Sequence, residues 1–199
     1  MGAAAVVTQL AALSRTPKFN LFNFLSLFTI PSTLFAAGVL FAVASRALKR
    51  KKASADLDKL RGAAVLYLVA EGVVFSLLLY KLSVELESPL FWFDVVVHYV
   101  MPVVLVVDWW VKPPRAEISG QTVWRWLWFP MAFFGVVLVR GAIVDWYPYA
   151  FLNPSIAGYP AVIAHAAGVA VGLTMLAWVV ADVGNRRRQH HVRSESAGV

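Results

Sequence analysis

The chain has no cysteine and few charged residues. Its 199 residues include no Cys, and only 15% of them are Asp, Glu, Lys or Arg. The lack of cysteine excludes disulfide bonds, thiolate metal sites and cysteine nucleophiles. Soluble domains usually carry about 25% charged residues. With 60% hydrophobic residues and a mean hydropathy of +0.68, the composition predicts a membrane protein.

Five segments are apolar enough to cross a bilayer, which takes roughly 20 residues for about 30 Å of hydrocarbon. We therefore predict an all-α, polytopic membrane bundle with five full transmembrane helices, at about 21–45, 63–82, 90–111, 123–144 and 159–181. A further apolar segment, Gly2–Leu13, reaches only about 18 Å as a helix. It predicts a sixth, partial helix at the N-terminus.

Positive charge gathers in alternate loops. Seven Lys or Arg residues lie in 46–61, and others lie in 112–125 and in the tail "NRRRQHHVR". Segments 82–89 and 145–158 contain neither residue type, and 82–89 carries Glu85 and Glu87. This asymmetry follows the positive-inside rule and predicts an integral protein of the cell membrane with a cytoplasmic C-terminus. It indicates that the basic residues, which give the chain a net charge of +7, interact with membrane lipids rather than with nucleic acid. We expect one transmembrane domain, 1–184, and a flexible basic tail, 185–199.

Polar side chains interrupt the predicted helices at similar depths. Thr29 and His98 each lie about eight residues, or roughly 12 Å, from the predicted outer ends of their helices. Ionisable residues inside a membrane usually face the bundle interior or a wet cavity. The set therefore predicts a polar pocket that opens outward, with further candidates at Glu71, Arg140 and His165.

Asp94 and His98 are four residues apart and share a helix face. A carboxylate beside an imidazole fixes its tautomer and raises its basicity, as in a relay of nucleophile, base and orienting group. Ser26 and Thr29 belong to a polar stripe on their helix. The alternative for Thr29 is a local bond to the carbonyl four residues earlier.

Other polar residues have structural alternatives. Glu71 could pair with Arg140 or His165, Arg140 could extend to the surface, and Asp108 could pair with a basic loop residue. "GVAVG" (168–172) places two glycines one turn apart, which permits close helix approach. HExxH is absent, so no metal is predicted, and no other cofactor is expected.

Three stretches carry a resemblance to a known family. They are "FNFLSLFTIPSTL", "VVVHYVMPVVLVVDWW" and "RWLWFPMAFFGVVLVRGAIVDWYPYAFLNP". In this order they are similar to the androgen-induced gene and androgen-dependent TFPI-regulating protein family of integral-membrane hydrolases, microbial branch. The resemblance implies that Thr29 and His98 form the catalytic pair. Animal members of the family cleave fatty-acid esters of hydroxy fatty acids.

The resulting hypothesis is a membrane-embedded lipid-ester hydrolase with Thr29 as nucleophile and His98 as general base. Asp94 would orient His98, and Arg140 would hold a substrate carboxylate at the mouth of the pocket. The alternative is a small-molecule or lipid transporter, or a lipid-binding protein, in which Glu71, Arg140 and the histidines line a polar route.

Overall fold

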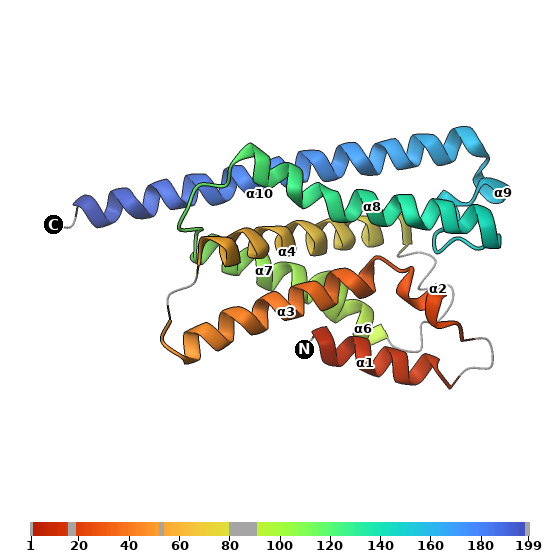
Figure 1. Cartoon of the computed structure of the whole chain (residues 1–199), viewed down its shortest axis with the longest axis horizontal. Helices are drawn as coiled ribbons and strands as arrows, with labels where there is room; N and C mark the ends of the chain where they lie inside the picture. The colour runs from red at the N-terminus through yellow and green to blue at the C-terminus, as the bar shows by residue number, and fades with distance from the viewer. Residues whose placement is uncertain (1, 16–18, 52–53, 80–90, 198–199) are drawn as a thin grey trace.

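The computed structural model describes residues 2–15, 19–51, 54–79 and 91–197 (Figure 1). The predicted outer loop with Glu85 and Glu87 lies outside the described residues. The regular secondary structure of the described ranges is helical throughout. Five helices are long and apolar enough to cross a membrane. The all-α prediction of five spans plus a short N-terminal helix is therefore confirmed, and the chain is that of a membrane protein.

The five spans run side by side in a bundle (Figure 1). The first is α3 (Thr29–Leu48), and the second is α4 (Ala55–Val74), which continues as the π-helix η1 (Phe75–Leu79). The third consists of α6 (Phe91–Val95), the π-helix η2 (Val96–Val100) and α7 (Met101–Val111). The last two are α8 (Gly120–Val144) and α10 (Tyr159–Ala197). The described ranges also contain four short helices: α1 (Gly2–Leu13), α2 (Leu21–Leu25), η3 (Ala150–Leu152) and α9 (Pro154–Ala157).

Helix α4 lies at the centre of the bundle. Of its apolar window, 67% is buried, against at most 33% in the other four spans. Its buried residues pack against α7, α8 and α10 in one large cluster that includes Leu66, Leu105 and Leu173. A polar residue in the middle of α4 is therefore enclosed by protein, whereas polar residues on the other spans can face lipid.

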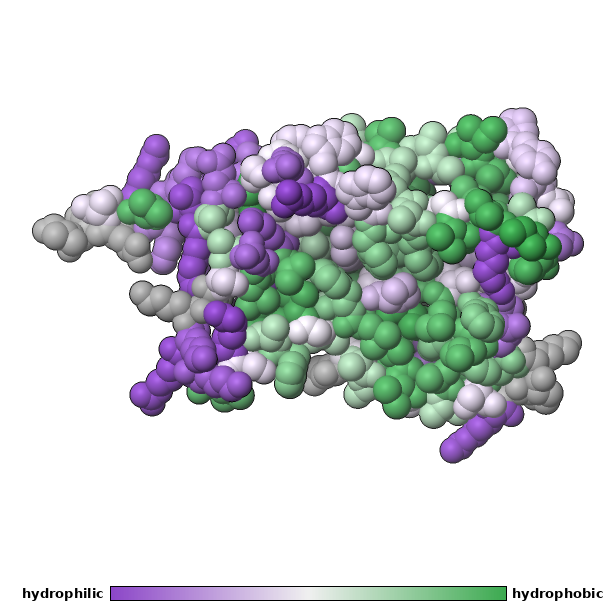
Figure 2. All heavy atoms as spheres, in the orientation of Figure 1, coloured by the Kyte–Doolittle hydropathy of each residue, from purple (hydrophilic) through white to green (hydrophobic). Residues whose placement is uncertain are grey.

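Hydrophilic and hydrophobic surfaces separate along the bundle. Figure 2 shows a mainly hydrophobic middle, with hydrophilic atoms at the end where α10 finishes and α4 begins. We call this the basic end, because Arg61, Lys112 and Arg188 lie there. At the opposite end α8 leads into α9, and α3 begins in that half of the bundle (Figure 1).

The predicted helix at about 21–45 is wrong in one respect, because it is interrupted. Helix α2 ends at Leu25 and α3 begins at Thr29, so Thr29 is the first residue of a helix rather than eight residues inside one. The Phe28 N–H donates to the Tyr149 hydroxyl at 3.0 Å instead of to a helical carbonyl. Pro31 has no N–H to offer the Leu27 carbonyl. Both features favour a new helix start here.

Two helices extend more than two turns beyond their predicted bounds. Helix α4 begins at Ala55 because the Ser54 side chain caps it by accepting from the Leu57 N–H at 3.2 Å. Helix α10 continues to Ala197, so it includes most of the predicted tail 185–199. Asn185 ties this part of α10 to the preceding loop, because its amide side chain bonds both the N–H and the carbonyl of Ile118.

Candidate functional site

A cavity lies between the start of α3 and the centre of the bundle. Thr29 from α3, Glu71 from α4 and His98 from η2 line it together. The segment between α8 and α10 adds Tyr149 and, from η3, Phe151. The rest of the wall is apolar: Phe28, Ala70, Val74, Phe75, Phe134, Val169 and Leu173. The structure thus brings Thr29 and His98, which are 69 positions apart in sequence, to one enclosed space.

Glu71 and His98 form the polar centre of this cavity. Glu71 Oε1 lies 3.0 Å from His98 Nδ1, and both residues are 6% exposed. The contact is short but poorly aligned, so neither atom makes a well-directed hydrogen bond within the described residues. Phe75 stacks on the imidazole with the ring centres 3.8 Å apart. Nδ1 therefore faces the carboxylate, and Nε2 is left for another partner.

Ser32 connects Glu71 to the start of α3. Its hydroxyl oxygen lies 2.6 Å from Glu71 Oε2 and 2.7 Å from the Phe28 carbonyl oxygen. A serine hydroxyl has one proton, so it cannot donate to both. Ser32 therefore contacts the Glu71 carboxylate and the first turn of α3 with one hydroxyl group.

Tyr149 provides a hydroxyl donor at the cavity wall. Its oxygen accepts the Phe28 N–H at 3.0 Å, and burial raises the pKa of the phenol, which keeps it protonated at neutral pH. The O–H proton has no acceptor within the described residues. An accepted hydrogen bond polarises the hydroxyl and strengthens it as a donor. Tyr149 was missed in the sequence, although it lies in the "DWYPYAFLNP" stretch.

Gly72 permits the close approach of α4 to His98. A Cβ at position 72 would lie 2.5 Å from the His98 carbonyl oxygen, which no ordinary contact allows. π-Helices often occur at functional sites. Here His98 lies within one, and the other, η1, begins at Phe75, one turn after Glu71. The glycine and the two π-helices set the position of the imidazole.

Asp94 does not take its predicted place. No hydrogen bond or ion pair joins it to His98 within the described residues, and Glu71 occupies that position. The predicted pairing of Glu71 with Arg140 or His165 is wrong for the same reason. The sequence showed only that Asp94 shares a helix face with His98. It did not show that the central helix brings a second carboxylate closer.

The other candidates lie apart from the cavity. Arg140 donates to Asn23 Oδ1 at 2.6 Å and lies over the Trp146 ring at 5.1 Å, so it joins α8 to α2. Ser26 donates to the Phe22 carbonyl at 2.7 Å, a local bond. His165 is exposed and meets the edge of Phe151.

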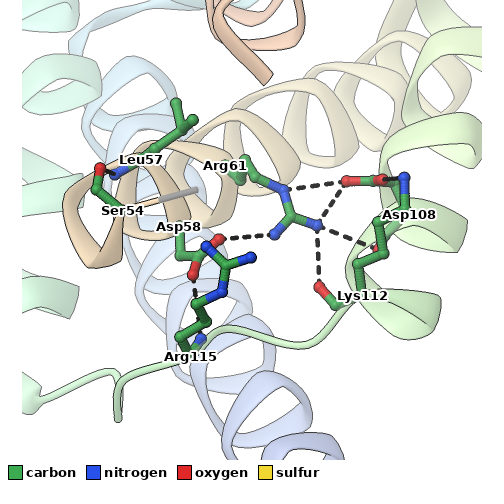
Figure 3. A network of polar contacts seen from close by, with 7 residues as sticks. All are labelled: Ser54, Leu57, Asp58, Arg61, Asp108, Lys112 and Arg115. Atoms are coloured by element: carbon green, nitrogen blue, oxygen red, sulfur yellow. Dashed lines mark hydrogen bonds and ion pairs between the residues drawn. The ribbon is translucent and has the colours of Figure 1, made fainter. Parts of the chain in front are cut away.

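A second polar cluster lies at the basic end. We call Asp58, Arg61 and Asp108 the Arg61 cluster (Figure 3). Arg61 donates to Asp58 Oδ1 at 2.9 Å and to Asp108 Oδ2 at 2.6 Å, and it also bonds the carbonyls of Asp108 and Lys112. Asp108 thus pairs with a basic residue, but Arg61 lies on α4 rather than in a loop. The suggested pairing with a basic loop residue is met by Lys112, whose Nζ lies 3.4 Å from Asp108 Oδ1.

Within the described residues, no group of three or more His, Asp or Glu side chains could hold a metal ion. Comparison of the chain with protein-family models, with curated proteins and with solved structures finds no match.

Proposed function

We propose that the protein is a membrane-embedded hydrolase of lipid esters, with Thr29 as nucleophile and His98 as general base. The observation that carries the proposal is the shared cavity, in which a hydroxyl, an imidazole and a carboxylate line one mostly apolar wall. The family resemblance assigns the same threonine and histidine. An apolar cavity between spans suits an ester that arrives from the bilayer.

In the first half of the reaction, Thr29 Oγ attacks the ester carbonyl carbon while its proton passes to His98 Nε2. Glu71 holds Nδ1 and stabilises the imidazolium. The Tyr149 O–H donates to the carbonyl oxygen as it becomes negative, the role of an oxyanion donor. When the tetrahedral intermediate collapses, the C–O bond to the alcohol breaks, and His98 returns the proton to the leaving alkoxide. The alcohol departs and an acyl-threonine remains.

In the second half, water attacks the acyl-threonine carbonyl and gives its proton to His98. The bond to Thr29 Oγ then breaks, the fatty acid leaves, and His98 returns the proton to Thr29. The charge asymmetry of the loops supports a cytoplasmic basic end in the cell membrane. In this orientation the cavity lies toward the outside, where water is available.

Covalent labelling tests whether Thr29 is the nucleophile. The purified protein is exposed to a fluorescent fluorophosphonate, whose phosphorus is attacked by an activated hydroxyl with loss of fluoride. We expect labelling of the wild type, none of Thr29→Ala, and labelling of His98→Ala slowed about 10²–10⁴-fold, the usual contribution of a general base. Tyr149→Phe should slow labelling about 10²–10³-fold, as the loss of one oxyanion donor does.

Ser26→Ala is the matched control, because this nearby hydroxyl, at the end of α2, bonds only a local carbonyl. Labelling that survives Thr29→Ala would remove Thr29 as nucleophile. A wild type that takes no label and also hydrolyses no lipid ester would favour the transporter alternative, in which the buried Glu71–His98 pair relays protons.

A further inference from the structure

A groove between α4 and α10 continues from the cavity. Its α4 side consists of Ala70, Val73 and Val74, with Leu77 of η1, and its α10 side runs from Ala164 to Leu176. Ala70, Val74, Val169 and Leu173 line both the groove and the cavity. The groove between α4 and α7 shares only His98 with the cavity. The α4–α10 groove is therefore the broader continuation of the site.

The glycines of "GVAVG" form part of this groove. The sequence suggested that Gly168 and Gly172 let another helix approach closely, but a Cβ at either position would have no atom within 4 Å. Both glycines line the groove instead. Their missing side chains widen the space between α4 and α10 on the side that faces the membrane.

The polar end of this continuous space suggests what occupies it. At the cavity, Glu71 Oε1 and His98 Nδ1 are buried without a well-directed hydrogen bond. Along the groove, the lining is aliphatic except for His165. A ligand that matches both parts has one polar group that fits beside His98 and a long apolar chain that fits between α4 and α10.

We infer that the α4–α10 groove binds the acyl chain of the ester, with the ester carbonyl at Thr29 and His98. This inference rests on the proposed function and assigns the groove to the acyl chain of the substrate. The chain passes between Val74 and Val169 and then lies along Gly168 and Gly172. The groove thereby favours long acyl chains over short ones, because a short chain ends inside the cavity.

Hydrolysis of 4-nitrophenyl palmitate and 4-nitrophenyl butyrate tests the inference. Gly168→Leu and Gly172→Leu fill the groove and replace glycine with a better helix former. We expect the ratio of kcat/KM for palmitate to that for butyrate to fall at least about tenfold, the scale of hydrophobic-pocket discrimination. Gly135→Leu on α8 is the matched control, because a Cβ there also meets no atom within 4 Å. It should leave the ratio unchanged.

Val73→Trp narrows the groove from its other wall and should lower the same ratio, so the result does not depend on α10 folding correctly. A ratio that stays at the wild-type value in all three groove variants, or falls equally in Gly135→Leu, would overturn the inference and leave bulk membrane lipid as the occupant.

A binding readout separates this inference from the proposed function. A palmityl ether with a photoreactive group near the chain end cannot be hydrolysed, yet it should crosslink to the α10 segment 164–176, and Gly168→Leu should abolish that crosslink. Crosslinking without ester hydrolysis would contradict the proposed hydrolase activity but support acyl-chain binding in the groove. Butyrate hydrolysis without the crosslink would support the hydrolase activity but contradict acyl-chain binding in the groove.

Discussion

The bundle holds two buried polar clusters of opposite character. At the basic end, Arg61 is 4% exposed, and it bonds two carboxylates and two carbonyls. Nearer the centre of the bundle, Glu71 and His98 are buried to a similar extent, but each keeps an atom without a well-directed hydrogen bond, and both line a cavity. A cluster whose polar groups are all hydrogen-bonded holds helices together. A cluster beside a cavity, with polar atoms that still lack a hydrogen-bond partner, is suited to bind or react with a ligand.

The Arg61 cluster joins three parts of the chain. Arg61 lies on α4, Asp108 lies near the end of α7, and Asp58 accepts the backbone N–H of Arg115 in the next loop at 3.0 Å (Figure 3). None of these groups lines the cavity near Thr29. We therefore expect that substitutions in the Arg61 cluster lower stability, whereas substitutions of Glu71 or His98 lower activity.

The largest expected effect follows from Arg61→Met. It leaves the buried Asp58 without its cation, which costs about 3–5 kcal/mol of unfolding free energy. The partly exposed Asp108 loses Arg61 as well, but keeps Lys112 at 3.4 Å. Thermal or denaturant unfolding in detergent micelles measures the loss. Arg186→Met is the control, because its pair with Asp182 is mostly exposed and such pairs contribute little. Equal stability of the two variants would show that the Arg61 cluster does not stabilise the bundle.

The next effect distinguishes two carboxylates. Glu71→Gln keeps the shape of the side chain but removes the charge beside His98 Nδ1, and we expect ester hydrolysis to fall about 100-fold or more. Asp94→Asn should leave hydrolysis unchanged, because no bond joins Asp94 to His98 within the described residues. Both variants should unfold close to the wild-type midpoint. Loss of hydrolysis in Asp94→Asn but not in Glu71→Gln would show that Asp94, not Glu71, orients His98.

The smallest effect compares two glycines on α4. A Cβ at Gly62 would lie 2.5 Å from the Trp126 ring, and one at Gly72 would lie 2.5 Å from the His98 carbonyl oxygen. Overpacking in each alanine variant should cost about 1–3 kcal/mol of stability. Only Gly72→Ala should also slow hydrolysis, by about tenfold, because it displaces His98. An equal loss of activity in Gly62→Ala would mean that the slowing reflects general destabilisation.

The spans were predictable because hydropathy is local. A run of about 20 apolar residues is favoured as a membrane helix whatever surrounds it, and all five predicted spans contain a long helix in the structure. The interruption between α2 and α3 was not predictable from that signal, because the Tyr149 hydroxyl that binds the Phe28 N–H comes from a distant part of the chain. The extension of α4 was missed because Arg61 was interpreted as a solvated loop charge.

The amino-acid sequence alone determined that this chain is a membrane bundle, and it determined which residues are costly to bury in hydrocarbon. It pointed to Thr29 and His98 through their depth and the family resemblance. Only the tertiary structure decided which carboxylate meets His98, that Ser32 and Tyr149 join the site, and that Gly168 and Gly172 line a groove. The reason is that the cost of burying a polar side chain in hydrocarbon depends on that side chain alone. Its hydrogen-bond partner depends on which face of a neighbouring helix lies within about 3 Å of it.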